Sequence, residues 1–257
     1  MKKLFTVFIS CSLLLFHACK KSSIEQPGLE LKSSALLFDE SGRSVDNSGM
    51  IVSVENSNPL ISTATDFRGN FVLPLDPALT SFTLVYSKPQ FGTFKRYFTK
   101  DGSGKLYYWD LNNKFQTDQT IEELGNISTV TINSFHAKII GDTLKITCNI
   151  SSLNNFGEKY ILILTQKDLP GISINTVDKT RINWSHKIAV KNGDNTFNFC
   201  LKCSAICNDW VSGNTIYLTA YGDSYYSNSY VDRSNNNLIL PNLNVNSSLT
   251  PVSIVMP

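Results

Sequence analysis

Residues 63–75 read TATDFRGNFVLPL, a β-prone segment, a tight turn and a second β-prone segment. Gly69 stands where the turn needs a residue with positive φ, which glycine adopts without steric cost. Phe71 is the first apolar residue after the turn, and we expect it to fill the core. The next apolar run, residues 81–87, has Phe, Leu and Tyr at alternate positions. This succession predicts a module built from short β-strands.

Residues 34–87 as a whole resemble the carboxypeptidase regulatory-like, transthyretin-like β-sandwich. The family pattern is a variable loop, a T-D-x-x-G-x-F turn and an apolar strand, and Asp66, Gly69 and Phe71 occupy the turn positions. The usual Gly-x-Tyr before the last strand is replaced by Leu-Thr-Ser-Phe at 79–82. The resemblance implies a first β-sandwich domain, residues 30–113, that is a structural or binding module without catalytic residues of its own.

Three consecutive aromatic residues, Tyr107, Tyr108 and Trp109, lie near the end of this domain. Neighbouring residues of a strand point to opposite faces, so Tyr107 and Trp109 share one face. They form either a platform for a sugar or an ordinary core pair. Residues 114–125 then read as a linker, in which Thr120 caps a one-turn helix that ends at Gly125.

Residues 126–257 predict a second β-sandwich, because strand-like runs recur at sandwich spacing with turns at Gly141-Asp142 and at 192–194. The segment 215–225 resembles the penultimate strand of a fibronectin type III or immunoglobulin-like domain. Apolar and other residues alternate there: Ile216, Leu218 and Ala220 against Tyr217, Thr219 and Tyr221. The expected fold is therefore all-β, with two consecutive sandwiches.

The N-terminal segment predicts where in the cell the protein is located. Lys2 and Lys3 precede an apolar run, residues 4–16, that is too short to span a bilayer but fits a signal peptide. Residues 15–19, Leu-Phe-His-Ala-Cys, resemble a bacterial lipoprotein lipobox. The resemblance implies a signal peptide at 1–18 and a lipid anchor, with palmitate among its acyl chains, on Cys19. The alternative is an ordinary secretory signal with Cys19 as an unpaired thiol.

Residues 19–29 read as a polar tether between the lipid and the first domain. By resemblance to lipoprotein sorting, Lys20 in place of aspartate implies the outer membrane. Bacteroidetes-like lipoproteins on the cell surface carry an acidic cluster after the cysteine, and Lys20-Lys21-Ser22-Ser23 has none. The periplasmic face is therefore expected rather than the cell surface, with the membrane contacted through the lipid.

Four cysteines remain after Cys11 leaves with the signal peptide and Cys19 is lipidated: Cys148, Cys200, Cys203 and Cys207. An oxidising compartment favours two disulfides, with three possible pairings. The alternation of side chains along the strands favours the pairs Cys148 with Cys203 and Cys200 with Cys207. The register of antiparallel strands argues against the first pair, because both cysteines lie late in their strands. Reduced buried thiols are the alternative. The spacing C-x2-C-x3-C also suits a metal or redox site, but it follows a strand rather than opening a helix.

Charge and motifs restrict the function. Removal of residues 1–18 takes two Lys and no acid, which leaves 21 basic and 21 acidic residues. No basic stripe remains for a nucleic acid, so none is expected as a partner. The two histidines outside the signal peptide, His136 and His186, stand apart and read as surface residues. No catalytic, metal or cofactor motif appears.

We therefore expect a non-catalytic lipoprotein of the cell envelope, a binding or scaffold module for an envelope protein or a glycan. The alternative is a glycan-processing hydrolase with dispersed carboxylates, since a glycosidase needs only two acids near each other in space; Glu122 and Glu123 read as solvated instead. The candidate binding loop is rich in Tyr, Ser, Gly and Asn, a composition typical of binding surfaces. Its aromatic members are Tyr221, Tyr225, Tyr226 and Tyr230.

Overall fold

The computed structural model describes residues 29–111, 113–117, 120–153, 157–166, 176–178, 182–191, 195–206, 212–245 and 250–257. The signal peptide, Cys19 and the tether up to residue 28 lie outside the described residues. Strands dominate, and the one α-helix in the described ranges, α2 (Cys203–Ile206), has 4 residues. The all-β class predicted from the sequence is confirmed.

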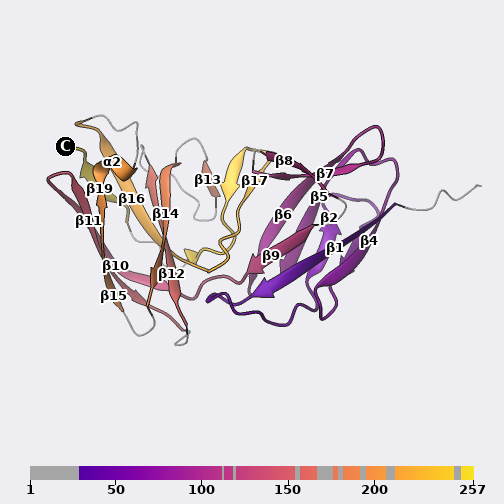
Figure 1. The fold of residues 1–257 in the computed structure, drawn as a ribbon, viewed down its shortest axis with the longest axis horizontal. Coiled ribbons are helices and arrows are strands. Elements are labelled where there is room, and N and C mark those ends of the chain that lie inside the picture. Colours follow the sequence, from indigo (N-terminus) through magenta and orange to yellow (C-terminus); the bar gives the residue numbers. More distant parts are fainter. Residues whose placement is uncertain are drawn as a thin grey trace, which may run out of the picture.

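The first half of the chain is a sandwich of two sheets (Figure 1). Sheet A has the order β4-β1-β9, and sheet B has the order β3-β2-β5-β6-β7-β8. A shared core of buried side chains, among them Leu37, Leu73, Leu84 and Phe98, fills the space between them. The strands are β1 (Leu29–Phe38), β2 (Ile51–Val54), β3 (Ser62–Ala64), β4 (Asn70–Leu75), β5 (Ser81–Lys88), β6 (Phe91–Lys100), β7 (Leu106–Asp110), β8 (Asn113–Gln116) and β9 (Ile121–Gly125).

The turn between β3 and β4 has the predicted geometry. Gly69 has a φ of 85°, and a Cβ there would lie 2.3 Å from the Ala35 carbonyl oxygen. The Asp66 carboxylate closes the turn, because its Oδ1 accepts the Asn70 N–H at 2.8 Å. Phe71 is buried, with its ring 6.1 Å from that of Tyr86. The sequence prediction for this turn is confirmed.

The prediction of a helical linker at 114–125 is wrong. Residues 113–116 form β8 at the edge of sheet B, and β9 pairs in parallel with β1, from Ser34 opposite Ile121 to Phe38 opposite Gly125. Leu124 and Glu122 point inward from β9, where Glu122 meets Arg96. An isolated helical turn is intrinsically unstable, whereas β9 gains a complete ladder with β1 and buries an apolar residue.

The second half of the chain is another sandwich (Figure 1), with sheet C in the order β10-β11-β15 and sheet D in the order β14-β12-β16-β19. Its core includes Ile146, Ile163 and Leu218. The strands are β10 (Thr131–Ile140), β11 (Thr143–Ser151), β12 (Lys159–Gln166), β14 (Ile182–Val190), β15 (Thr196–Lys202), β16 (Thr215–Asp223) and β19 (Val252–Val255).

A third, small sheet covers the outer side of sheet D. Sheet E consists of β13 (Thr176–Asp178), β18 (Asn237–Ile239) and β17 (Tyr230–Asp232), in that order. The chain that follows β18 places Leu240 and Leu243 against Leu162, Leu164 and Tyr221 of sheet D. Both faces of β12 are therefore covered, which explains why all of its residues are buried. In Figure 1, β17 lies between the two sandwiches.

Of the two disulfides favoured by alternation, the pair Cys148 with Cys203 is wrong. Cys148 and Cys203 are free and buried, and both belong to the core of the second sandwich, so alternation placed them on the correct face. However, Cys148 lies opposite Phe197, whereas Lys202, the neighbour of Cys203, lies opposite Thr143. Cys203 is six residues beyond Phe197, so at about 3.3 Å per residue the two cysteines are about 20 Å apart, too far for a disulfide. Cys200 is free and exposed, and Cys207 lies outside the described residues.

Candidate functional site

The four tyrosines of the predicted binding loop lie in three different environments. Tyr221 is part of β16 and is only 4% exposed, packed against the leucines that follow β18. The prediction that Tyr221 contacts a partner is therefore wrong. Its position in an alternating strand was correct, but the segment that follows β18 covers the face that would otherwise reach solvent.

Tyr225 and Tyr226 lie in a seam between the two sandwiches, formed by residues 223–228 against the end of β1 and the turn after it. The Tyr226 ring centroid is 4.1 Å from that of Phe38. Tyr225 stands 4.9 Å from Tyr226 and 5.5 Å from Tyr160. A Cβ on Gly42 would lie 2.6 Å from the Tyr225 ring. Both rings thus fix one sandwich to the other.

Backbone polar groups close the seam around these rings. The Tyr225 N–H donates to the Glu40 carbonyl at 2.9 Å. The buried Glu40 carboxylate accepts the Thr129 N–H at 2.6 Å and the Thr129 hydroxyl at 2.8 Å. The Asn242 amide donates to the Gly125 carbonyl at 2.5 Å. These long-range bonds hold the two halves in one orientation.

Tyr230 opens a hairpin, made of β17 and β18, that reaches from the second half of the chain onto the first sandwich. Its ring meets Phe94 of β6 edge-on, at 5.8 Å, and burial raises the pKa of the Tyr230 hydroxyl. The turn of the hairpin is shaped by Asp232, whose Oδ1 accepts the N–H of Ser234 at 2.9 Å and its hydroxyl at 2.6 Å. Those bonds also lower the pKa of the Asp232 carboxyl.

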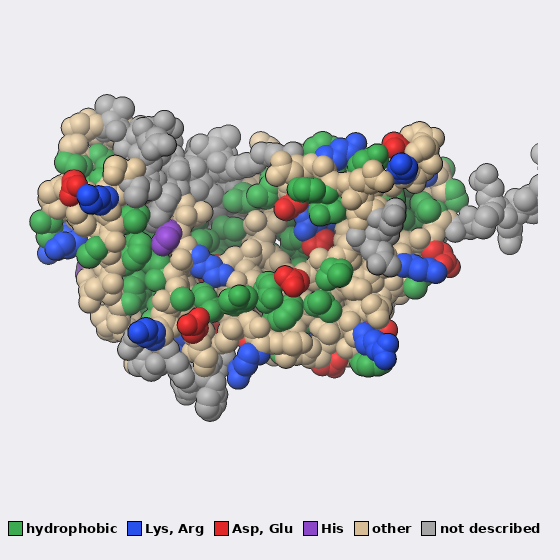
Figure 2. Space-filling model, in the orientation of Figure 1, with side chains coloured by type: hydrophobic (Ala, Val, Ile, Leu, Met, Phe, Trp, Pro, Cys, Tyr) green, Lys and Arg blue, Asp and Glu red, His purple; other side chains and the backbone are tan. Residues whose placement is uncertain are grey.

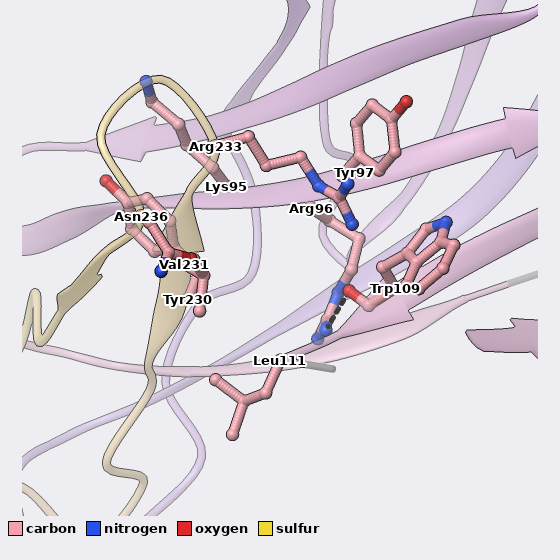
Figure 3. Close-up of a pocket in the computed structure, with 9 residues that line it drawn as sticks. All are labelled: Lys95, Arg96, Tyr97, Trp109, Leu111, Tyr230, Val231, Arg233 and Asn236. Atoms are coloured by element: carbon pink, nitrogen blue, oxygen red, sulfur yellow. Dashed lines mark hydrogen bonds between the residues drawn. The ribbon is translucent and has the colours of Figure 1, made fainter. Parts of the chain in front are cut away.

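A groove of about 350 Å³ lies where this hairpin meets sheet B (Figure 3). Tyr97 and Trp109 form one side, and Tyr230, Val231 and Asn236 come from the hairpin. The groove residues also include Lys95, Arg96, Leu111 and Arg233. We call this set the junction groove, because neither half of the chain makes it alone.

The aromatic residues of the junction groove are cross-strand neighbours. Tyr97 of β6 is paired with Trp109 of β7, and both are half-buried. They lie on the outer face of sheet B, since the intervening Phe98 and Tyr108 contribute to the core. Tyr107 and Trp109 therefore share a face as predicted. Of the two alternatives for that pair, the structure has the outer face rather than the core.

Cations lie over these rings. The Arg233 guanidinium carbon is 3.8 Å from the Tyr97 ring centroid and 4.9 Å from that of Trp109. Figure 3 shows Arg233 reaching from the hairpin turn towards Tyr97. Lys114 of β8 stands with its Nζ 4.3 Å from the Tyr107 ring centroid. Such cation–π contacts stabilise the arrangement and hold the side chains in place.

The other two cations of the groove are neutralised by carboxylates. Lys95 forms an ion pair with Glu55. Arg96 lies 2.7 Å from Glu122 and 3.1 Å from Asp110. Burial would lower the pKa of Arg96, but the hydrogen bonds to Glu122 and Asp110 raise it above its ordinary value. The sequence reading of Glu122 as a solvated residue is wrong, because it is 5% exposed.

Two further hollows differ from the junction groove in their chemistry. One, of about 270 Å³, adjoins it across Lys95 and Arg233 and includes the acids Glu55 and Asp232. The other, of about 530 Å³, lies over sheet C beside His136 and Cys200. It is larger, but its described lining residues include no Tyr, Trp or Phe. The junction groove is the one with paired aromatic walls.

The described part of the chain also bears on metal binding, on the two histidines and on membrane-spanning helices. No group of three or more His, Cys, Asp or Glu residues there is arranged to hold a metal ion. His136 is exposed, and His186 stacks on Phe199 with ring centroids 5.1 Å apart. Among the described helices, none has the length and apolar character needed to cross a membrane. On the face seen in Figure 2, basic and acidic side chains are interspersed.

Of the residues that line the junction groove, Tyr230 and Trp109 are predicted from the sequence as candidates for binding, whereas Tyr97, Arg233 and Asn236 are not. Alternation along β6 could have placed Tyr97 on the same outer face as Lys95. No local signal joins Arg233 to Tyr97, which lie in different halves of the chain.

No protein-family model matches the chain. No curated protein matches it either. Three solved structures are similar at low level. A candidate carbohydrate-binding protein from Bacteroides uniformis has 10% identity and a TM-score of 0.30, over 88% of this chain and 98% of that chain. A DUF3823 family protein from Bacteroides ovatus has 10% identity and a TM-score of 0.32, over 90% and 100%.

The third, a DUF3823 family protein from Parabacteroides merdae, has 11% identity and a TM-score of 0.30, over 84% of this chain and 98% of that chain. The three neighbours come from Bacteroides and Parabacteroides species.

Proposed function

We propose that this protein is a non-catalytic glycan-binding module of the cell envelope and that the junction groove is its ligand site. The observation that carries the proposal is the cross-strand pair Tyr97 and Trp109, half-buried on the outer face of a sheet and facing a groove with polar groups. Aromatic side chains offer rigid apolar area, while a few polar groups fix the orientation of a ligand. A sugar ring presents apolar C–H faces and hydroxyls, so it suits both kinds of group.

The location of the groove supports the same proposal. Ligand sites are common at junctions between domains, and here the hairpin of one half closes over the sheet of the other. The bonds of the seam hold the two halves together before any ligand arrives. A preformed groove of this kind avoids part of the entropy cost of binding.

The carboxylates near the groove support binding rather than hydrolysis. A glycosidase needs a pair of acids that flank the bond to be cleaved. Glu122 and Asp110 both bond Arg96, and Glu55 bonds Lys95. In the part of the chain that the structure describes, no Asp or Glu lines the junction groove itself. The acids in this region are therefore engaged in structural ion pairs.

We further propose that Cys19 carries a lipid that holds the protein at the outer membrane, on its periplasmic face. The lipobox-like residues 15–19 and the absence of acid at 20–23 support this location. The first described strand begins at Leu29, at the end of the first sandwich away from the second half (Figure 1).

The proposed site is tested by glycan-array screening of the full mature chain with Cys19→Ser, followed by calorimetry with the sugars that bind. Trp109→Ala should weaken binding at least tenfold, as truncation of a binding aromatic typically does. Phe67→Ala is the matched control, because Phe67 is an aromatic residue of the same sandwich that is 70% exposed and outside the groove. Absence of glycan binding, or equal affinities for the three proteins, would refute the proposal.

A further inference from the structure

We infer that the glycan bound in the junction groove is acidic and that Arg233 recognises its carboxylate or sulfate group. This inference rests on the proposed function and adds the chemical class of the ligand. Three cations, Lys95, Arg96 and Arg233, line the groove, and among the described residues no Asp or Glu lines it.

Arg233 differs from the other two cations. Lys95 is paired with Glu55, and Arg96 with Glu122 and Asp110. Arg233 has no carboxylate within ion-pair distance in the described part of the chain, and it is exposed. The adjacent carboxylate of Asp232 is engaged by Ser234. The charge of Arg233 is therefore available to a ligand.

The stacking of Arg233 also leaves its donors accessible. A guanidinium is planar and carries its N–H groups at the edges of the plane. With its carbon 3.8 Å from the Tyr97 ring centroid, one face of the group is occupied by the ring. The edges keep their hydrogen-bonding capacity. A carboxylate or sulfate can accept two parallel bonds from such an edge.

The same contacts make the site preorganised. Tyr97 and Trp109 restrict the guanidinium from the sheet side, and the hairpin that carries Arg233 is fixed by Tyr230 on Phe94. A restrained side chain loses less conformational freedom when a ligand binds. Arg233 covers part of both aromatic rings, so the ring surface that it leaves open would contact the sugar while Arg233 holds its anionic group.

The surrounding acids indicate how many anionic groups the site accepts. Glu55 and Asp232 line the adjoining hollow on the other side of Lys95 and Arg233. Glu55 is already paired with Lys95, so a densely charged polymer that extended into this hollow would meet the Asp232 carboxylate and be repelled by it. The arrangement fits one acidic sugar flanked by neutral sugars better than a polyanion.

The test uses calorimetry on the full mature chain with matched oligosaccharides. The probes are a galacturonic acid trisaccharide and its methyl ester, a glucuronic acid disaccharide and its neutral glucose counterpart, and a sulfated trisaccharide with its desulfated form. The wild type should prefer the acidic member of at least one pair at least tenfold, the effect expected for loss of a charged hydrogen-bonded pair.

Arg233→Gln should abolish this preference by weakening the acidic ligand about tenfold, while the neutral ligand changes less than twofold. Arg233→Lys should recover only part of the preference, because it keeps the charge and loses the planar fork. Arg68→Gln is the matched control, since Arg68 also stacks on an aromatic ring, Phe67, at 5.2 Å, but outside the groove.

The outcomes separate the two proposals. Equal binding of acidic and neutral partners, or an unchanged preference in Arg233→Gln, would overturn the acidic ligand and leave glycan binding intact. Binding of none of the acidic or neutral sugars would overturn both. Melting temperatures of all variants within a degree or two of the wild type would show that any loss reflects recognition rather than unfolding.

Discussion

Arg96 and Glu122 form a two-point ion pair across the interior of the first sandwich. Arg96 Nε lies 2.8 Å from Glu122 Oε1, and Nη2 lies 2.7 Å from Oε2. Arg96 belongs to sheet B and Glu122 to sheet A, so the pair joins the two sheets at the edge where β9 completes sheet A. The prediction of a helical linker is wrong at Glu122, which lies in β9 and is buried.

Glu122→Gln should lower the free energy of unfolding by about 3 kcal/mol, near the lower end of what breaking a buried pair costs. The change leaves the Arg96 charge buried with Asp110 as its remaining acid. Urea denaturation measures the loss. Glu123→Gln, at the neighbouring exposed position, is the control and should change stability by less than about 0.5 kcal/mol. Equal effects of the two substitutions would contradict a structural role for the pair.

Tyr226→Ala should destabilise the seam rather than remove a partner contact. The ring packs on Phe38 across the two sandwiches, and its loss should cost about 2 kcal/mol. Differential scanning calorimetry should show a lower melting temperature or a split transition, because the halves become less coupled. Tyr226→Phe keeps the ring and should behave like the wild type. An unchanged transition in Tyr226→Ala would mean that the ring contributes nothing to the seam.

The local pattern of apolar and turn residues was sufficient to predict much of the fold from the sequence. Met50, Val52 and Val54 alternate in the sequence, and all three are buried. Gly69 and Phe71 were assigned correctly, because a tight turn restricts φ and the next apolar residue must face the core. These features depend on neighbours within a few residues, which the sequence displays directly.

Contacts between distant segments could not be predicted in this way. The segment 121–125 contains two glutamates after a possible cap, and only its parallel pairing with β1 makes it a strand. The junction groove depends on a hairpin from the second half that lies against β6. Tyr221 was assigned to a surface for the same reason, since the residues that cover it follow β18.

Asp101→Asn should weaken the turn that presents Tyr107 and Trp109, and the effect should depend on pH. The Ser103 hydroxyl, the N–H groups of Lys105 and Ser103, and the Tyr107 hydroxyl all donate to Asp101 and lower its pKa from 3.8 to about 2. Because the folded-state pKa is depressed, the carboxylate stabilises the fold at neutral pH, and this contribution disappears as the pH falls from about 4 to about 2.

The melting temperatures of wild type and Asp101→Asn should therefore differ at neutral pH and converge as the pH approaches 2. The two proteins share every other titrating group. The difference between their melting temperatures at each pH therefore reports Asp101 alone. A difference that is constant across the whole range would show that the Asp101 charge does not stabilise the turn.

Cys148 should resist thiol reagents in the native protein. Burial raises its pKa to about 12, and the thiolate is the reactive form. Maleimide labelling followed by peptide mass analysis should detect Cys148 only after unfolding. Cys200 is exposed, so its labelling also tests the remaining predicted pair with Cys207. Cys200 that is labelled only after reduction would support that pair, and labelling without reductant would exclude it.

Tyr230→Ala should open the junction groove by releasing the hairpin from the first sandwich. Its ring contact with Phe94 holds β17 against β6, and the hairpin carries Arg233 and Asn236 into the groove. Because the hairpin contributes little to either main core, we expect the melting temperature to fall by only a few degrees, whereas the affinity for a bound glycan should drop at least tenfold. Calorimetric titration alongside thermal melting separates the two effects. Tyr230→Phe keeps the edge-on packing and should retain binding, so an equal loss in both variants would point to the Tyr230 hydroxyl rather than to the position of the hairpin.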